Sequence, residues 1–408
     1  MLQALPLVFV LTGLALYTVL GGADFGAGFW QLTAPRRAKD AAIREHAHQA
    51  MAPVWEANHV WLIFVFTVLW TAYPTAFSSI ASTLAIPLLI ALVGIVFRGA
   101  AYTLRAGAET PRESARVDTV FSLSSILVPF ALGAAIGAIA TDRVPVGNAA
   151  GDPWSSWLNA TSLFIGFLAV ATSAYLAAVY LAADAAHDGE SALEQAFRRR
   201  ALGAGVGAGA LAIAGIFVAE ADSQGLFDSL TTGRALPAVI ASAIAGLATL
   251  VLVLQRRYEL ARYSSALAVA AITAGWALAR WPVILPDLTV NQAAAGHDTL
   301  VCVVVAVIGG AVVLFPALAL LFGLTLRGRF RSAPQVASPG NTPPRHQAST
   351  RLPARLAAAC LIAGCGLLNV ADAEWAHAVG LTCLFGFVVL AFVAITLPDT
   401  VGDPRLLP

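Results

Sequence analysis

The fold of this chain is decided by the stretch from residue 5 to residue 44, LPLVFVLTGLALYTVLGGADFGAGFWQLTAPRRAKDAAIR. The stretch is apolar through Trp30 apart from Asp24, and no Lys or Arg precedes Arg36. At a helical rise of about 1.5 Å per residue, the apolar part is long enough to cross about 30 Å of hydrocarbon. No small-residue cleavage site followed by a soluble domain comes after it, so we interpret it as a retained transmembrane helix.

The same alternation of apolar stretch and polar gap continues along the chain. Apolar residues make up 59% of the 408 residues, charged residues 12%, and the mean hydropathy is +0.78, which is far from the composition of an ordinary soluble domain. Strand patterns are absent, and lipid-exposed segments must satisfy their own backbone hydrogen bonds. The sequence therefore predicts an all-α polytopic membrane protein with eleven spanning stretches, at residues 5–30, 54–74, 77–104, 117–140, 157–183, 200–220, 235–254, 262–281, 298–326, 355–371 and 376–398.

Basic residues occupy every second gap between these stretches. They gather within residues 36–44, 98–116, 198–200, 256–262 and 327–355, with Arg405 in the tail, whereas the opposite side receives only Arg143, Arg234 and Arg280. The positive-inside rule assigns the basic gaps to the cytoplasm. The N-terminus is therefore predicted to lie outside the cytoplasm.

One gap differs in composition from the others. Residues 327–354 are basic and rich in Pro, Ser and Thr, a composition that cannot bury enough apolar surface to become ordered. We interpret this segment as a flexible cytoplasmic linker. It separates a nine-helix membrane domain, residues 1–326, from a C-terminal transmembrane hairpin and short tail, residues 355–408.

Three ionisable residues lie inside the first three spanning stretches, where each would cost several kcal/mol unless it faced a partner or water. They are Asp24, Glu56 and Arg98. The helices that carry them alternate in direction, and at 1.5 Å per residue all three side chains fall within about 10 Å of the cytoplasmic edge of the hydrocarbon. Two carboxylates and one guanidinium are therefore predicted to share one layer.

His59 belongs to the same layer, because it lies three residues after Glu56 and so shares its helix face. Its side chain titrates near neutral pH. A layer of acids and a histidine predicts a site where protons enter from the cytoplasm. An alternative is that Asp24 and Arg98 form a buried ion pair that only locks helix packing, and that Glu56 is a first-turn acid favoured by the helix dipole.

Other chemistry is limited by the residue inventory. The net charge is +1, so the charge balance gives no indication of nucleic-acid binding. The four cysteines form no CxxC pair that would indicate a zinc site. No pair of His or Met side chains lies at mid-helix, where a haem in a helical bundle needs its axial ligands. We therefore expect no haem or metal to be bound by this chain, and any haem to belong to a partner. Glycines at four-residue spacing, such as Gly133 and Gly137, predict close helix packing.

These landmarks together resemble subunit II of the cytochrome bd-type quinol oxidases, over residues 1 to about 326. The resemblance rests on the Gly-rich stretch from Gly22 to Gly28, on the run from Ala52 to Leu62 that contains Trp55 and Glu56, and on the Phe97-Arg98 pair. The motif residues are Gly22, Gly26, Gly28, Trp55, Asn58 and Trp61. Many members of the family differ from this chain at Glu56, Ala57 and His59.

The resemblance implies a fold of nine helices arranged as two four-helix bundles plus one, in the membrane of a bacterial cell. It also implies an oxidase that oxidises a membrane quinol and reduces O₂ to water, with haem b and d-type haem held by the larger subunit I. This chain would then be the non-haem half of a heterodimer that supplies protons through Asp24, Glu56 and Arg98. A structural quinone bound here is a further option, and the C-terminal hairpin is a candidate substitute for a small accessory subunit.

Two other functions remain as alternatives. A proton-coupled secondary transporter would show paired helix breaks in two repeated halves and charge near the midplane; Pro87 and Pro129 interrupt helices here, but no repeat is visible and the charges lie near one edge. A structural membrane scaffold differs from the oxidase subunit only in giving Glu56 no proton role.

Overall fold

The computed structural model describes residues 2–34, 41–49, 55–105, 110–326, 352–370 and 373–396. The chain is helical almost throughout these ranges, which agrees with the predicted all-α class. Its elements are η1 (Leu2–Ala4), α1 (Leu5–Leu16), η2 (Tyr17–Gly21), α2 (Gly22–Thr33), α3 (Ala41–Gln49), α4 (Trp55–Ala72), α5 (Pro74–Thr83), α6 (Ala85–Arg105), α7 (Pro111–Ala140), α8 (Ala160–His187), α9 (Ser191–Asp222), α10 (Gln224–Thr231), α11 (Leu236–Leu254), α12 (Tyr258–Arg280), β1 (Val283–Leu285), β2 (Leu288–Thr289), α13 (Val290–Ala293), α14 (His297–Leu326), α15 (Leu352–Val370) and α16 (Glu374–Thr396).

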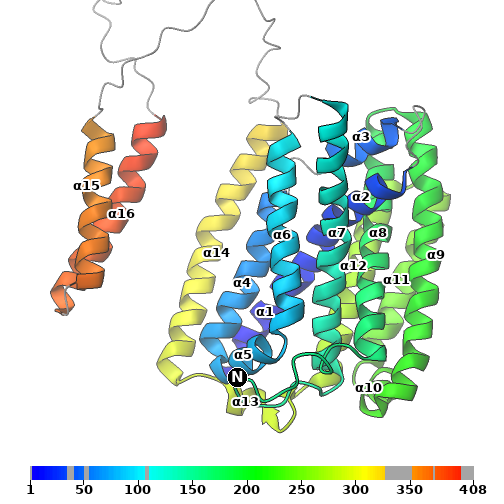
Figure 1. The fold of residues 1–408 in the computed structure, drawn as a ribbon, viewed down its shortest axis with the longest axis horizontal. Coiled ribbons are helices and arrows are strands. Elements are labelled where there is room, and N and C mark those ends of the chain that lie inside the picture. Colours follow the sequence, from blue (N-terminus) through cyan, green and yellow to red (C-terminus); the bar gives the residue numbers. More distant parts are fainter. Residues whose placement is uncertain are drawn as a thin grey trace, which may run out of the picture. The chain divides into compact units, whose positions relative to one another are not determined.

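The helices form two compact units, Met1–Phe322 and Gly323–Pro408. In the first unit the long helices run side by side between two ends (Figure 1). One end carries the N-terminus together with the short helices α5, α10 and α13, and we call it the N-terminal end. The other end carries α3 and is called the α3 end.

Within the described residues, seven helical segments are long and apolar enough to cross a membrane: Leu2–Thr33, Ala85–Arg105, Glu113–Ala140, Ala160–His187, Ser191–Asp222, Leu236–Leu254 and His297–Ala317. The sequence predicts nine spans in this unit. The remaining two are α4, whose apolar part is shortened to Asn58–Ala72, and α12, which carries Glu259, Arg262 and Arg280. A count of nine thus stays a prediction, whereas a multi-pass membrane protein is supported directly.

Three local features differ from the prediction. The stretch predicted as one helix at 77–104 is broken at Leu84 into α5 and α6, because Pro87 in the first turn of α6 disfavours a continuous helix through the residues before it. A helix, α3, occupies part of the first gap, and a two-stranded antiparallel hairpin, β1–β2, connects α12 to α13. Of the predicted linker at 327–354, residues 327–351 lie outside the described residues, and α15 begins at Leu352.

Glycines allow the central helices to approach closely. A Cβ added at Gly137 would lie 2.5 Å from Cα of Ser162, and one at Gly133 would lie 2.9 Å from the carbonyl oxygen of Ile165, so α7 and α8 are in backbone contact there. The same four-residue spacing has no such role at Gly203 and Gly207, where nothing in the described structure lies within 4 Å of an added Cβ. The four-residue spacing of glycines therefore predicted close helix contacts correctly at some positions only.

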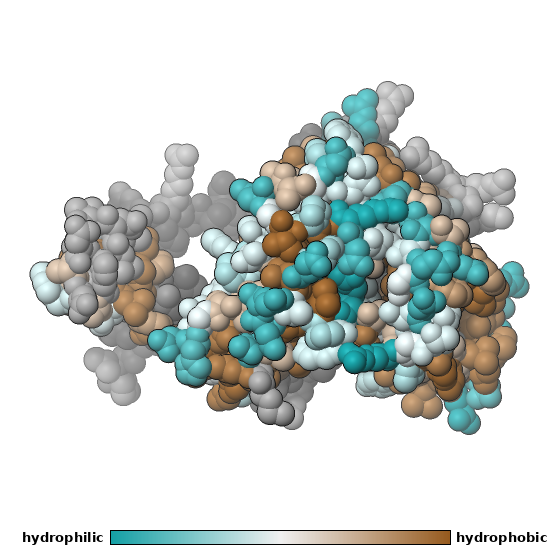
Figure 2. Space-filling view, turned by 90° about the horizontal axis from the view of Figure 1, so that it is seen from below, coloured by the Kyte–Doolittle hydropathy of each residue, from teal (hydrophilic) through white to brown (hydrophobic). Residues whose placement is uncertain are grey.

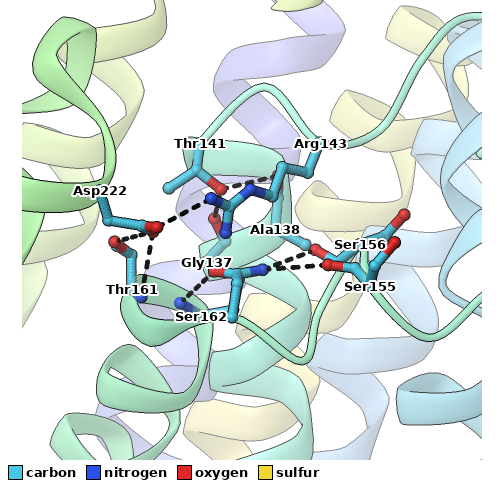
Figure 3. A network of polar contacts seen from close by, with 10 residues as sticks. Gly137, Ala138, Thr141, Arg143, Ser155, Ser156, Thr161, Ser162 and Asp222 are labelled. Atoms are coloured by element: carbon cyan, nitrogen blue, oxygen red, sulfur yellow. Dashed lines mark hydrogen bonds and ion pairs between the residues drawn. The ribbon is translucent and has the colours of Figure 1, made fainter. Parts of the chain in front are cut away.

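Polar contacts hold the N-terminal end together. Arg143 donates to Asp222 at 2.9 Å, and the Thr161 hydroxyl donates to the same carboxylate at 2.6 Å (Figure 3). These contacts tie the segment after α7 to α8 and α9. Arg280 pairs with Asp142, so two of the three arginines that break the charge pattern are balanced by acids at that end.

The surface of this end is correspondingly polar. Figure 2 looks onto it and shows hydrophilic side chains spread over its centre, with apolar side chains toward the sides. Such a change from polar cap to apolar flank is expected where a helical bundle leaves the hydrocarbon.

The second unit is a helical hairpin of α15 and α16. A Cβ added at Gly364 would lie 2.8 Å from the Leu384 side chain and 3.0 Å from the carbonyl oxygen of Gly380. Small residues on both helices therefore permit close packing, which is the usual way for helices to associate in lipid.

Candidate functional site

An ion pair between Asp24 on α2 and Arg98 on α6 forms the centre of the candidate site. Arg98 Nη2 donates to Asp24 Oδ1 at 2.6 Å, and Arg98 Nη1 donates to Oδ2 at 2.8 Å. Nη2 also reaches the Asp24 carbonyl oxygen at 3.2 Å. Both side chains are only 1% exposed. The structure thus brings together two of the residues that the sequence places in one layer.

Aromatic rings enclose the guanidinium of Arg98. Its Cζ lies 4.7 Å from the ring centre of Phe25 on α2 and 4.7 Å from that of Phe121 on α7. Each cation–π contact of a desolvated Arg is worth up to about 2 kcal/mol. The two ring faces and the bidentate carboxylate therefore offset part of the free-energy cost of removing this charge from water.

The Gly-rich stretch lets α2 reach this position. A Cβ added at Gly26 would lie 1.8 Å from the carbonyl oxygen of Ser173 on α8, and one at Gly28 would lie 2.3 Å from Ser125 Oγ on α7. At Gly22 the nearest atom, on Leu176, would be 3.2 Å away. The glycines thus carry no chemistry, but they set the depth to which α2, and with it Asp24, enters the bundle.

A π-helical segment, η2, joins α1 to α2 just before Asp24. Such segments leave backbone groups without their regular partners and are frequent at functional sites. Asn58 on α4, which is buried, donates from Nδ2 to the carbonyl oxygen of Leu20 in this segment at 3.3 Å. The motif residue Asn58 therefore satisfies the irregular backbone beside the ion pair.

His59 follows on the same helix and contacts two aromatic rings of the site. Its ring centre lies 6.1 Å from that of Tyr17 and 6.0 Å from that of Phe25, both edge-to-face. Phe25 therefore contacts both His59 and Arg98. Trp61 packs against a buried cluster that contains Tyr17 and Phe25. The side chains of Trp55 and Glu56 lie outside the described part of the structure, so the place of Glu56 in the layer stays a prediction.

Further charged groups lie at the α3 end, above the ion pair. Arg105 on α6 contacts Glu45 on α3 at 3.3 Å and Asp118 on α7 at 3.2 Å. His48 on α3 lies between these helices, with its ring centre 6.1 Å from Tyr102 and 6.1 Å from Phe121. The sequence did not indicate this group, because nothing in the residues around 41–49 shows that α3 folds back onto α6 and α7.

A cavity of about 450 Å³ lies on the other side of the ion pair. It is almost entirely apolar and extends from Tyr17 and Phe25 to Trp276 and Trp281, at the carboxyl end of α12. Tyr17 Oη and Trp276 Nε1 are buried polar atoms that have no hydrogen-bond partner among the described residues. The dimensions and lining are those of a pocket for a small apolar molecule or chain.

No group of three or more His, Cys, Asp or Glu in the described residues is arranged to hold a metal ion. The groups that the structure brings together around the ion pair are a carboxylate, a guanidinium and an imidazole, which can carry charge or protons. Buried carboxylates and histidines in a membrane usually serve in ion or proton pathways.

Comparisons with known proteins agree on one family. The family model described as cytochrome bd terminal oxidase subunit II matches residues 2–325. Cytochrome bd ubiquinol oxidase subunit 2 of Bacillus subtilis is 28% identical over 114 residues, which cover 28% of this chain and 33% of the relative. Cytochrome bd-I ubiquinol oxidase subunit 2 of Escherichia coli is 26% identical over 121 residues, which cover 30% of this chain and 31% of the relative. The chain thus spans about a third of the length of the curated relatives it matches.

A chain in the solved structure of the bd oxidase from Geobacillus thermodenitrificans shares the fold, with a TM-score of 0.63, 23% sequence identity, and coverage of 80% of this chain and 98% of that chain. The resemblance found in the sequence is confirmed by the family match, which extends over the whole membrane domain. This chain belongs to the cytochrome bd terminal oxidase subunit II family.

Proposed function

We propose that this chain is the non-haem subunit II of a bacterial terminal oxidase that oxidises a membrane quinol and reduces O₂ to water. Subunit I, as its heterodimer partner, holds haem b and a d-type haem, which supply the oxygen chemistry. The family match carries this proposal. The residue inventory supports it, since this chain has no mid-helix pair of His or Met for axial haem ligands.

In this proposal the α3 end faces the cytoplasm and the N-terminus lies outside it. The support is the distribution of Lys and Arg along the sequence: the gaps at the α3 end are rich in them and include Arg105, Arg198 and Arg262, whereas the gaps on the opposite side carry only Arg143, Arg234 and Arg280. Protons for O₂ reduction are then taken up at the α3 end.

The role of the layer is to pass these protons from the cytoplasm toward subunit I. Glu56 accepts protons near the surface, His59 relays them, and the Asp24–Arg98 pair provides a fixed dipole next to the path. The observation that carries this step is the burial of a bidentate ion pair one aromatic ring away from His59. Buried charge in a membrane segment is costly, and where it is present it usually belongs to an ion or proton pathway.

The complex purified through a tag on this subunit tests the assignment. We expect a visible spectrum with b- and d-type haem bands, because subunit I co-purifies. A colourless preparation that still catalyses proton-coupled solute uptake would contradict the oxidase and favour the secondary transporter.

The cavity beside Tyr17 supports a second, smaller proposal: it holds a structural quinone. The lining fits an isoprenoid chain, and either the Tyr17 hydroxyl or the Trp276 indole N–H can donate to a quinone carbonyl. Organic extraction of the purified complex, followed by mass spectrometry, should yield one quinone more per complex in the wild type than in a Trp276→Phe/Tyr17→Phe variant. Equal quinone content would contradict this placement.

A further inference from the structure

Two histidines on α3 face different parts of the bundle. The ring of His46 lies 5.5 Å from the ring of Phe197 on α9, and its Nε2 is 3.2 Å from the carbonyl oxygen of Leu181 on α8. His48 instead lies against Tyr102 on α6 and Phe121 on α7. His46 therefore docks the helix, whereas His48 points toward the helices that carry the candidate site.

His48 occupies the position between the surface charges and the buried ion pair. Phe121 contacts both His48, at 6.1 Å between ring centres, and the guanidinium of Arg98, at 4.7 Å. One aromatic ring thus separates the imidazole from the buried pair. Toward the surface, Arg105 joins Glu45 and Asp118. His48 is half-buried, and its Nδ1 is buried without a hydrogen-bond partner among the described residues.

We propose that His48 is the group through which protons pass from the surface of the α3 end into the layer of Asp24, Arg98 and His59. This inference rests on the proposed function of the layer in proton supply, and it adds a residue that the family motif does not contain.

The chemistry of the imidazole suits this position. Burial, and next the neighbouring Arg105, lower the pKa of His48 below its usual 6.5, while Asp118 and Glu45 act in the opposite direction. The ring is therefore neutral at pH 7 and offers one N–H donor and one acceptor nitrogen.

A proton from water at the surface can bind the acceptor nitrogen. The proton on the other nitrogen then passes through water to the imidazole of His59, so that the His48 ring ends neutral. The charged groups around it come from every helix that packs against it: Glu45 from α3, Arg105 from α6 and Asp118 from α7. The two acids stabilise the transient imidazolium, and Arg105 prevents the ring from keeping the proton.

The test compares His48→Gln with His46→Gln in the purified oxidase complex reconstituted into liposomes. Quinol-driven turnover and the rate of proton uptake from the α3 side are measured, together with haem content as a measure of assembly. We expect His48→Gln to assemble normally and to slow both rates by about a hundredfold, the lower end of the range for loss of a proton-transferring side chain. Added imidazole should restore part of the loss, and His46→Gln should retain the wild-type rates.

The possible results distinguish a failure of the role proposed for His48 from a failure of the proton function proposed for the layer. If Glu56→Gln slows proton uptake but His48→Gln does not, His48 lies off the path and the inference is overturned while the layer keeps its role. If neither variant slows uptake, the proposed proton function itself is wrong. Equal losses in His46→Gln and His48→Gln, with no rescue by imidazole, would show that α3 matters only for packing and would also overturn the inference.

Discussion

The main energetic question in this protein is how much the buried Asp24–Arg98 ion pair contributes to its stability and to its function. Removing one partner from a buried ion pair leaves an uncompensated charge and costs about 3–5 kcal/mol, whereas replacing both partners by apolar residues is often neutral. The bidentate contact, with Nη1–Oδ2 at 2.8 Å and both side chains 1% exposed, places this pair in that class. Its contribution to stability can therefore be separated by mutation from the role in proton supply that we propose.

Asp24→Asn and Arg98→Gln should each reduce the yield and melting temperature of the complex, because each leaves a buried charge unpaired. The double variant Asp24→Leu/Arg98→Met should recover most of the stability and still turn over slowly, because the charge beside the proton path is gone. Thermal melting and quinol oxidase assays on the same preparations measure the two effects. Recovery of both stability and turnover would show that the pair only locks helix packing.

Acidification should weaken the docking of α3 through His48. Burial and Arg105 hold the pKa of His48 below 6.5, its value in the unfolded chain. Its contribution to stability is therefore fully present above about pH 6.5 and is lost as the pH falls through the folded-state pKa. The melting temperature should drop more between pH 7 and pH 5 in the wild type than in His48→Gln. An identical drop in both would show that His48 titrates alike in the folded and unfolded chain.

The sequence could predict Asp24, Arg98 and their common depth, because charge inside an apolar stretch is conspicuous and helical rise converts position into depth. It could not predict Tyr17, Phe121 or His48 as neighbours of the pair, because these contacts depend on how helices distant in the chain pack. The sequence identified Asn58 as a motif residue. Its hydrogen bond to the carbonyl oxygen of Leu20 could be recognised only once the structure showed the π-helical segment η2.

At the scale of elements, α2 is positioned by the close approach of its backbone to α7 and α8. Trp30 strengthens this contact by donating from Nε1 to the carbonyl oxygen of Ala174 at 2.8 Å. The sequence predicted that the glycines serve packing, and the contacts at Gly26 and Gly28 show which helices they serve. The sequence predicted one span at 77–104, because the apolar pattern continues across the break between α5 and α6. Pro87 indicated an interruption in this span, and the structure places it at Leu84.

Gly26→Ala should prevent α2 from docking on α8, because the new Cβ would lie 1.8 Å from a backbone oxygen that cannot rotate away. We expect a loss of about 3 kcal/mol or more, at or above the upper range for overpacking. Gly209→Ala on α9 is the matched control, since nothing in the described structure lies within 4 Å of its Cβ. Membrane yield and thermal melting of both variants measure this difference. Equal stability of the two variants would mean that the helices are not in backbone contact at Gly26.

At the scale of the whole molecule, the chain combines a membrane domain of known family with a second helical unit, Gly323–Pro408, that the family match at residues 2–325 does not include. Composition and charge pattern were sufficient to predict the multi-pass architecture, because each spanning stretch is set by hydrophobicity and length. The role of the second unit is not predictable in this way, since packing of α15 on α16 says only that they form a hairpin.

Deletion of residues 330–408 tests the hypothesis that this hairpin substitutes for a small accessory subunit. We expect the truncated chain to insert into the membrane, because the first unit is compact by itself, but to give a complex with less haem and lower turnover. Haem content per complex and oxidase activity are the readouts. Unchanged assembly and turnover would leave the hairpin without an accessory role.

The central claim is that protons for O₂ reduction enter through the layer near the α3 end of this subunit. Glu56→Gln tests it most directly, because Gln keeps the size of the side chain and removes only its ability to take up a proton. In the purified complex with normal haem content, a pH-indicating dye should report proton uptake about a hundredfold slower than in the wild type, with a parallel loss of quinol-driven O₂ consumption. Uptake and consumption at wild-type rates in that variant would contradict the account.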